Sequence, residues 1–279
     1  MPTPHPHALN RIELQVDLNY EVAAPGADFV FNVHAAHTPC QSLSAERLLL
    51  TPAVVSRTHT DSATGNRYLR LHATPGTLQL TYAVTVDLMH RRSDPAQLEE
   101  VPIDRLPPEV LGYLYPSRYC QSDRLLTLAS HEFGRLKPGY GRVQAIRDWV
   151  HGHATFTSHS TNSNTSALDT LIDRVGVCRD FAHLAIAFCR CMNIPARYCT
   201  GYLGDMGTEP PYGTMDFAGW FEAYLGDRWY TFDARNNTPR IGRVLIARGR
   251  DACDVALSST FGPNTLQHFR VWAEEVAVA

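Results

Sequence analysis

The spacing of apolar residues changes character after the first third of this 279-residue chain. Residues 10–90 alternate between apolar and polar, and turn signals such as Thr74-Pro75-Gly76 separate the alternating segments. Alternation predicts half-buried β-strands, so we expect an all-β module here. The charged segment 91–108 carries four prolines and is expected to be a surface connector. These boundaries predict a β-rich domain over residues 1–100 and a second domain over residues 101–279.

Helices and strands both follow in the second domain. Apolar residues of the segment 141–150 fall on one face of a helix, and Ser166 is placed to cap a short helix that ends near Gly176. The next helix begins at Cys178 and is ended by Pro195. Strands are expected at 196–203, 217–225, 228–234 and 243–247. The fold class expected for the whole chain is α+β, with an amino-terminal β-sandwich-like domain.

Composition and charge exclude several classes of function. The chain is 44% hydrophobic and 19% charged, with a formal net charge of −3. It is therefore globular, with no general attraction to nucleic acid or to anionic membranes. The amino-terminal segment lacks the features of a secretory signal, and no apolar run reaches the ~18–20 residues of a membrane span. The seven cysteines are too unevenly spaced for a disulfide framework. We therefore expect a cytoplasmic protein with reduced thiols and no nucleic-acid or membrane partner.

Cys178 is the most informative cysteine because it stands at the start of a predicted helix. The unpaired amides and the positive end of the helix dipole favour a thiolate there, and the thiolate is the nucleophilic form. The same amides are suited to bind the oxyanion of a tetrahedral intermediate. The competing interpretation is a buried structural thiol, which is the common role of cysteines outside disulfides.

The remaining cysteines predict no metal site. Cys189 and Cys191 lie about 200° apart around a helix axis, and Cys199 lies on a predicted strand. The pair His151 and His153 lacks nearby partners for a metal ion. We therefore expect neither a metal nor a cofactor.

A hairpin is predicted between residues 217 and 234. Its two-residue loop, Gly226-Asp227, favours a type II′ turn that pairs residue 225 with residue 228. In this register Asp233 lies opposite Trp220, and position 218 is its diagonal neighbour on the same face. A side chain at position 218 is therefore within hydrogen-bonding reach of Asp233.

Several motifs occur in order along the second domain. They are GVCRDFAHL at 176–184, IPARY at 194–198, GYL at 201–203, WFEAY at 220–224 and WYTFD at 229–233. With these motifs the chain resembles the bacterial transglutaminase-like superfamily over about residues 144–250, and the β half resembles the domain that often precedes this core. The resemblance implies a papain-like core that performs acyl transfer with a Cys-His-Asp triad, as transglutaminases, peptidases or amidases do. Carried over by position, the nucleophile falls on Cys178 and the acid that orients the base falls on Asp233.

The catalytic base of the family has no counterpart at the matching position of this chain. Active relatives have a histidine two residues before the tryptophan of the hairpin, where this chain reads Asp216-Phe217-Ala218-Gly219-Trp220. Ala218 therefore occupies the slot of the family histidine. A cysteine near its ordinary pKa of about 8.5 is only a few per cent thiolate at neutral pH, and no imidazolium remains to protonate a leaving amine. Loss of one triad member typically costs several orders of magnitude in rate.

Other histidines are alternatives for the base. His183 follows Cys178 by five residues, about 140° around the helix, and is expected to be a hydrogen-bonded core histidine. His151, His153 and His159 precede the helix on a segment whose path the spacing does not fix. One of them entering the cleft stays an open alternative.

Two functions remain open. The first is a cysteine-dependent acyl-transfer protein, a peptidase or amidase that acts on a peptide or protein carboxamide and is weak or inactive because Ala218 replaces the base. The second is a non-catalytic transglutaminase-like module whose cleft binds a peptide or protein. Cys178 and Asp233 favour the first and Ala218 favours the second. The sequence thus leaves open whether the chain is an enzyme, and it indicates no oligomeric state.

Two further features accompany the motifs. A basic run after the hairpin would suit a carboxylate-rich peptide, but it lacks interleaved aromatic residues, so we expect a solvated surface paired with acids. Its members are Arg235, Arg240, Arg243, Arg248 and Arg250. The polar segment 157–165 is either a wall of the cleft or an ordinary connection.

Overall fold

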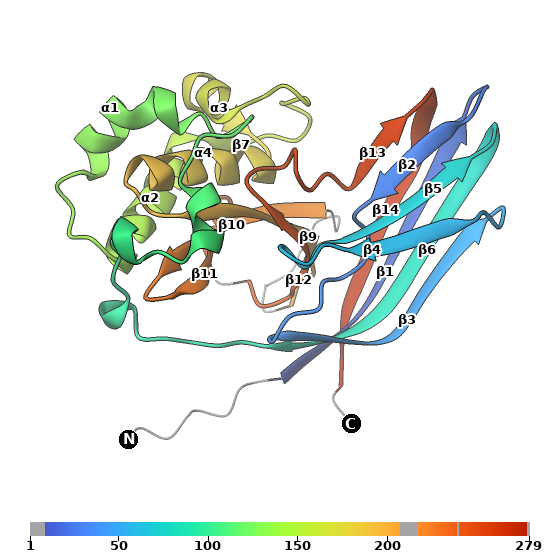
Figure 1. Ribbon diagram of the computed structural model, residues 1–279, viewed down its shortest axis with the longest axis horizontal. Coiled ribbons are helices and arrows are strands. Elements are labelled where there is room, and N and C mark those ends of the chain that lie inside the picture. Colours follow the sequence, from blue (N-terminus) through green and yellow to red (C-terminus); the bar gives the residue numbers. More distant parts are fainter. Residues whose placement is uncertain (1–8, 207–216, 239, 278–279) are drawn as a thin grey trace.

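The computed structural model describes residues 9–206, 217–238 and 240–277, which form two parts lying side by side (Figure 1). One part is a sandwich of two antiparallel sheets, with strand orders β14-β1-β6-β3 and β13-β2-β5-β4. Its strands are β1 (Leu9–Val22), β2 (Ala27–Phe31), β3 (Gln41–Thr51), β4 (Ser56–Thr60), β5 (Arg67–Ala73), β6 (Gly76–Met89), β13 (Ser258–Phe261) and β14 (Asn264–Val276). The expected β-sandwich is confirmed.

The other part is a mixed core, in which helices lie beside a four-stranded antiparallel sheet of order β11-β10-β9-β12 (Figure 1). The helices are α1 (Ser122–Phe133), α2 (Tyr140–His153), α3 (Ala167–Asp173) and α4 (Cys178–Cys191). The sheet strands are β9 (Ala196–Leu203), β10 (Phe217–Leu225), β11 (Arg228–Phe232) and β12 (Arg243–Gly249). A short parallel pair, β7 (Thr155–Phe156) and β8 (Val175–Gly176), leads into α4. The α+β class is confirmed.

Alternation along β1 produces the interior of the sandwich. Every second residue from Ile12 to Val22 is at most 2% exposed, and the residues between them are more exposed. Successive strand side chains point to opposite faces, so this spacing buries one face and leaves the other toward solvent.

The expected second domain, residues 101–279, needs correction at its carboxyl end. β14 pairs with β1 over Arg11 to Val22, and β13 pairs with β2. The last two strands therefore belong to the sandwich and not to the core. This pairing joins segments more than 200 residues apart, which no local pattern in the sequence specifies.

The connector, residues 91–108, and the segment that follows it cover part of one face of the core sheet, so the connector is more than a surface loop. The connector contains the short helices η1 (Pro95–Gln97) and η2 (Ile103–Arg105), and η3 (Pro108–Tyr113) begins at its end. Leu106 and Val110 are buried against Tyr224 of β10. The connector thus shields part of the sheet face opposite α4.

The two parts are joined along β12 by two side-chain amides. The amide of Gln41 donates to the Leu245 carbonyl at 2.9 Å and accepts from the Leu245 N–H at 2.8 Å. Asn66 makes the same two contacts with the backbone of Arg248, each at 2.8 Å. Both amides replace a missing strand partner at this edge of the sheet, so the sandwich and the core share a well-paired seam.

Helix α4 is the central element of the core. From Asp180 to Cys191 all of its residues are buried, and it packs against β9, β10 and the other three helices. A helix that is buried on all sides holds its first residue in a fixed position relative to the sheet. Among the described residues, no helix is long and apolar enough to cross a membrane.

Candidate active site

Cys178 is the first residue of α4, as expected, and its thiol lies against the backbone of β10. The N–H of Gly219 donates to the Cys178 Sγ at 3.3 Å. Cys178 is half-buried, whereas burial raises the pKa of Cys120 to about 12 and that of Cys191 to about 11. The two pKa shifts leave those thiols protonated, so the partly accessible Cys178 differs from them in both position and surroundings.

Asp180 fixes the start of α4. Its buried carboxylate accepts from the Val177 N–H at 2.9 Å, which closes the first turn as a capping box does. It also accepts from the Thr161 hydroxyl at 2.8 Å, and Arg179 donates to the Asn162 carbonyl at 2.8 Å. The polar segment 157–165 is therefore bound to the helix turn that carries Cys178. The acid three residues into the helix is visible in the sequence, but its partner Thr161 is not.

The predicted hairpin register is confirmed, but Gly226 and Asp227 both have a positive φ, so the turn is of type I′ and not of the expected type II′. Leu225 pairs with Arg228 and Phe221 with Phe232, so Asp233 follows directly opposite Trp220. Asp216, part of the motif around the base slot, lies outside the described residues. Ala218 pairs with Gly201 of β9 and lies beside the residue whose N–H contacts the Cys178 thiol.

The side chain of Ala218 lies on the face of β10 opposite that of Phe221. It packs with Trp220, Cys199 and Leu245, whereas Phe221 belongs to the cluster around α4. The Cys178 thiol therefore contacts the backbone of β10, next to position 218, where the side chain is only the methyl group of alanine.

Asp233 is buried and is held by two partners that sequence reasoning missed. Its carboxylate forms an ion pair with Arg243 and accepts from the Asn236 side chain at 2.7 Å and the Asn236 N–H at 2.9 Å. In a Cys-His-Asp triad an imidazole would stand at this carboxylate. A guanidinium and an amide stand there instead, and neither transfers protons near neutral pH.

The Arg243–Asp233 ion pair spans the core sheet. Asp233 follows β11 at one edge of the sheet, and Arg243 begins β12 at the other edge. In this register Arg243, Ala218 and Asp233 fall on the same face of the sheet, and Gly201 is the residue paired with Ala218. The Arg243 guanidinium lies 5.7 Å from the ring centroid of Trp220. Trp220 is the next residue after Ala218 on the same face of β10.

The histidines near the core have other partners. His183 is fully buried, its Nε2 accepts from the Ala252 N–H at 3.1 Å, and burial lowers its pKa well below the usual value. It is a core histidine, as expected. His153 donates to the Leu171 carbonyl at 2.9 Å, and His151 donates to the Ala234 carbonyl at 3.0 Å. Neither is hydrogen-bonded to Asp233 among the described residues.

Tyr198 lies beside Gly219 and was not suggested by any sequence motif for catalysis. A side chain at position 219 would collide with the Tyr198 hydroxyl, so a glycine is needed there. Burial raises the pKa of Tyr198 well above its usual value, and the Cys178 charge adds to this shift. The phenol therefore stays protonated and is not a general base.

Four of the five arginines in the basic run are paired with acids, as expected, but only Arg250 is solvent-exposed and the other four are half-buried. Arg240 pairs with Asp205 at 3.4 Å, Arg243 with Asp233, Arg248 with Glu222 at 3.1 Å and Arg250 with Asp254 at 3.0 Å. Arg235 has no carboxylate partner among the described residues.

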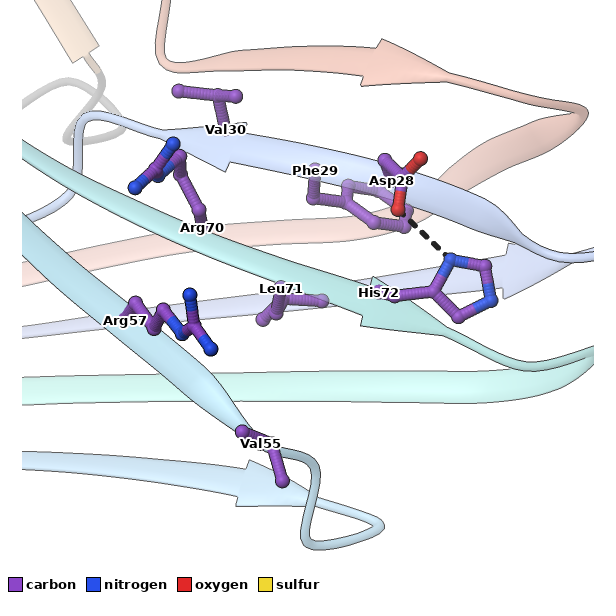
Figure 2. Close-up of a pocket in the computed structure, with 8 residues that line it drawn as sticks. All are labelled: Asp28, Phe29, Val30, Val55, Arg57, Arg70, Leu71 and His72. Carbon is purple, nitrogen blue, oxygen red and sulfur yellow. Dashed lines mark hydrogen bonds and ion pairs between the residues drawn. The ribbon is translucent and has the colours of Figure 1, made fainter.

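A separate hollow of about 330 Å³ lies on the outer face of the sandwich (Figure 2). It is lined by Asp28, Phe29, Val30, Val55, Arg57, Arg70, Leu71 and His72. The Nδ1 of His72 lies 2.8 Å from the Oδ1 of Asp28. Arg57 of β4 is directly opposite Arg70 of β5. None of the predicted site residues lines it.

Comparison with known proteins matches both parts of the chain. The model of the transglutaminase-like superfamily core matches residues 128–234, and that of the bacterial transglutaminase N-terminal domain matches residues 11–109. The crystal structure named "Putative Cysteine Protease from Cytophaga hutchinsonii" is 41% identical, covers 98% of this chain and 92% of its own, and superposes with a TM-score of 0.90. The papain-like core expected from the resemblance is thereby confirmed.

Two curated relatives are mycobacterial. An uncharacterised protein of Mycobacterium leprae is 32% identical over 117 residues, which is 41% of this chain and 42% of that protein. An uncharacterised protein of Mycobacterium tuberculosis is 27% identical over 256 residues, which is 78% of this chain and 77% of that protein.

Proposed function

The chain belongs to the transglutaminase-like superfamily, and from this premise we propose that it is a cysteine-dependent acyl-transfer protein of the peptidase or amidase type. Cys178 is the proposed nucleophile. The contact of its thiol with the Gly219 N–H, beside the base slot, is the observation that carries this proposal. The substrate is a peptide or protein carboxamide. We propose a cytoplasmic location and no nucleic-acid or membrane partner, on the grounds of cysteine spacing and net charge.

The proposed reaction begins with attack of the Cys178 thiolate on a carbonyl carbon. An Sγ–C bond forms, the leaving group departs with the electron pair of the broken bond, and the thiol proton passes to solvent. We propose that amides of the first turn of α4 donate to the developing oxyanion.

Proton transfer is the weak step of this site. Position 218 is an alanine, and Asp233 is held by Arg243, which cannot act as an acid or a base near neutral pH. A leaving amine needs a proton, whereas a nitrophenolate does not. We therefore expect acylation by activated esters, slow release of the acyl group, and very slow turnover of amides.

The test is a reaction with p-nitrophenyl acetate at pH 7.5. We expect a burst of nitrophenolate of about one equivalent followed by slow turnover, and an acetyl group mapped by mass spectrometry to Cys178. Cys178→Ala should lose the burst, while the matched change Cys253→Ala, at an exposed cysteine, should keep it. Absence of a burst, or acetylation that maps elsewhere, would contradict the assignment of the nucleophile.

A non-catalytic peptide-binding module is the second candidate. The engagement of the Asp233 carboxylate by Arg243 and Asn236 favours it, because this carboxylate is then no longer available to orient a base. Peptide binding that survives Cys178→Ala, together with no acylation of the wild-type protein, would support the module over the enzyme.

A further inference from the structure

Arg235 differs from the rest of the basic run in its partners. Its guanidinium lies 4.0 Å from the ring centroid of Phe156 and donates to the Asn236 side chain at 3.3 Å. No carboxylate among the described residues pairs with it. Stacking on an aromatic face holds an arginine in one orientation and leaves its outer N–H groups available to a ligand.

Both members of this stacked pair belong to segments that adjoin the candidate site. Phe156 pairs with Gly176 in the short parallel ladder, two residues before Cys178. Arg235 follows Asp233 by two residues, and its carbonyl accepts from His151 at 3.1 Å, which fixes the backbone there. The stacked pair therefore stands where the turn before Cys178 meets the turn after Asp233.

Among the residues that the structure describes, the surroundings of Arg235 carry more positive than negative charge. Arg235, Arg240 and Arg243 interact electrostatically, whereas the acids that offset them are Asp205 and Asp233. The pKa of Arg240 is lowered by burial and by both neighbouring guanidinium groups. In the described part of the chain three cations thus accompany two carboxylates, and the cation without an acid there is the half-buried Arg235.

Phe156 adds an apolar surface at the same place. It is 41% exposed although it is a large aromatic residue beside the candidate site. An exposed ring beneath a guanidinium presents an apolar wall and a charged edge together. This combination suits an acyl chain that ends in a carboxylate.

We propose that Arg235, seated on Phe156, is a specificity-determining residue that binds a carboxylate of the acyl donor, so that the preferred substrates carry an anionic group near the scissile carbonyl. This inference rests on the proposed acyl transfer at Cys178. The carboxylate stays ionised and unchanged throughout; it orients the donor while the Sγ–C bond forms and the leaving group departs with its electron pair.

The test compares two activated esters on the same protein. The probes are p-nitrophenyl butyrate, which is neutral, and p-nitrophenyl hemiglutarate, whose acyl chain ends in a carboxylate. The measured quantity is the ratio of the two rates of Cys178 acylation, each divided by the rate of the same ester with N-acetylcysteine. We expect the ratio to favour the anionic ester by about tenfold, since a charge-assisted hydrogen bond at a half-buried site is worth roughly that factor.

Arg235→Gln should bring this ratio close to one, and Arg235→Lys should keep part of the preference, because lysine retains the charge but not the planar fork. Phe156→Leu should also lower the ratio, and it serves as a second variant because its site is on the surface. Arg228→Gln is the matched control: this exposed arginine lies at the other end of the hairpin, and both rates should stay as in the wild type. Added salt should reduce the preference.

The outcomes separate the two proposals. Acylation of Cys178 with no preference for the anionic ester, or with a preference that Arg235→Gln leaves intact, would overturn the role of Arg235 alone. No acylation of Cys178 by either ester would overturn the proposed function and this inference with it.

Discussion

Position 218 decides what the candidate site is able to do. The absence of the histidine is visible in the sequence, but its structural consequence is not. The carboxylate that would orient an imidazole is bound by Arg243 from the opposite edge of the sheet. That contact depends on the register of β12 with β9, which the sequence pattern of either strand alone does not specify.

The ion pair leads to a prediction about restoring the triad. A histidine introduced by Ala218→His must compete with Arg243 for Asp233 and for the space above β10, so this change alone should raise ester turnover little. Adding Arg243→Gln should remove the cation from the carboxylate, and the double variant should turn over p-nitrophenyl acetate at least about tenfold faster than Ala218→His, which is a small share of the 10²–10⁴ that acid-base catalysis typically contributes.

The measurement is the steady-state rate after the burst, for both single variants and the double variant. Arg243→Gln alone leaves Asp233 buried without a cation and should cost about 3 kcal/mol in the free energy of unfolding, so thermal unfolding is recorded for each protein. The double variant with Cys178→Ala must lose the gain. If Ala218→His alone matches the double variant, Arg243 does not block the slot.

At the scale of elements, local sequence patterns predicted those features of the strands that depend on contacts between residues close in the chain. The period of two in β1 predicted its buried face, and the two-residue loop at Gly226 predicted the hairpin register that sets Trp220 opposite Asp233. The connector at residues 91–108 is not the expected surface loop, because its Leu106, and Val110 just after it, are buried against Tyr224 of β10. Pairs within a hairpin are fixed by the chain itself, whereas the packing of a connector depends on which surface lies beneath it.

The strand pair β4–β5 places two arginines opposite each other, and changing one of them should stabilise the sheet. Arg57 stands directly opposite Arg70, and among the described residues neither has a carboxylate partner (Figure 2). Directly opposed like charges destabilise a sheet, and opposed unlike charges stabilise it, by about 0.2–1 kcal/mol. Arg70→Gln should therefore raise the free energy of unfolding slightly and Arg70→Glu should raise it further.

Urea denaturation of both variants checks this prediction. The double change of Arg57→Glu with Arg70→Glu recreates a like-charge pair and should lose the gain. Equal stability of Arg70→Glu and the wild type in low salt would show that the two guanidinium groups are too well solvated to interact.

At the scale of the whole molecule, the last two strands return to the sandwich that the first strands form. β13 and β14 complete the sandwich that β1 and β2 start, and the amides of Gln41 and Asn66 bind the sandwich to β12. The sequence predicted two domains but not this return, because closure by the last strands is a non-local pairing with no local signal. The site residues on β10 and β12 therefore depend on both parts of the molecule for their position.

Two buried histidines predict how the stability of the whole molecule depends on pH. Burial lowers the pKa of His34 to about 4 and the pKa of His183 well below its usual 6.5. Just below pH 6.5 both imidazole rings are therefore neutral in the folded state, whereas the same histidines bind protons in the unfolded chain. Stability is therefore fully present above about pH 6.5 and is lost as the pH falls below the unfolded-state value.

At pH 5.5 each such histidine costs about 1.4 kcal/mol, because the unfolded state gains a proton that the folded state does not bind. The free energy of unfolding, measured in urea, should be about 3 kcal/mol lower at pH 5.5 than at pH 7.5. His34→Asn should remove about half of this difference between the two pH values, because asparagine does not titrate. This holds even if the substitution changes the stability at pH 7.5. A pH difference that is unchanged in this variant would show that His34 is protonated in the folded state, and that the space beside Tyr82 and Arg67 admits a second cation.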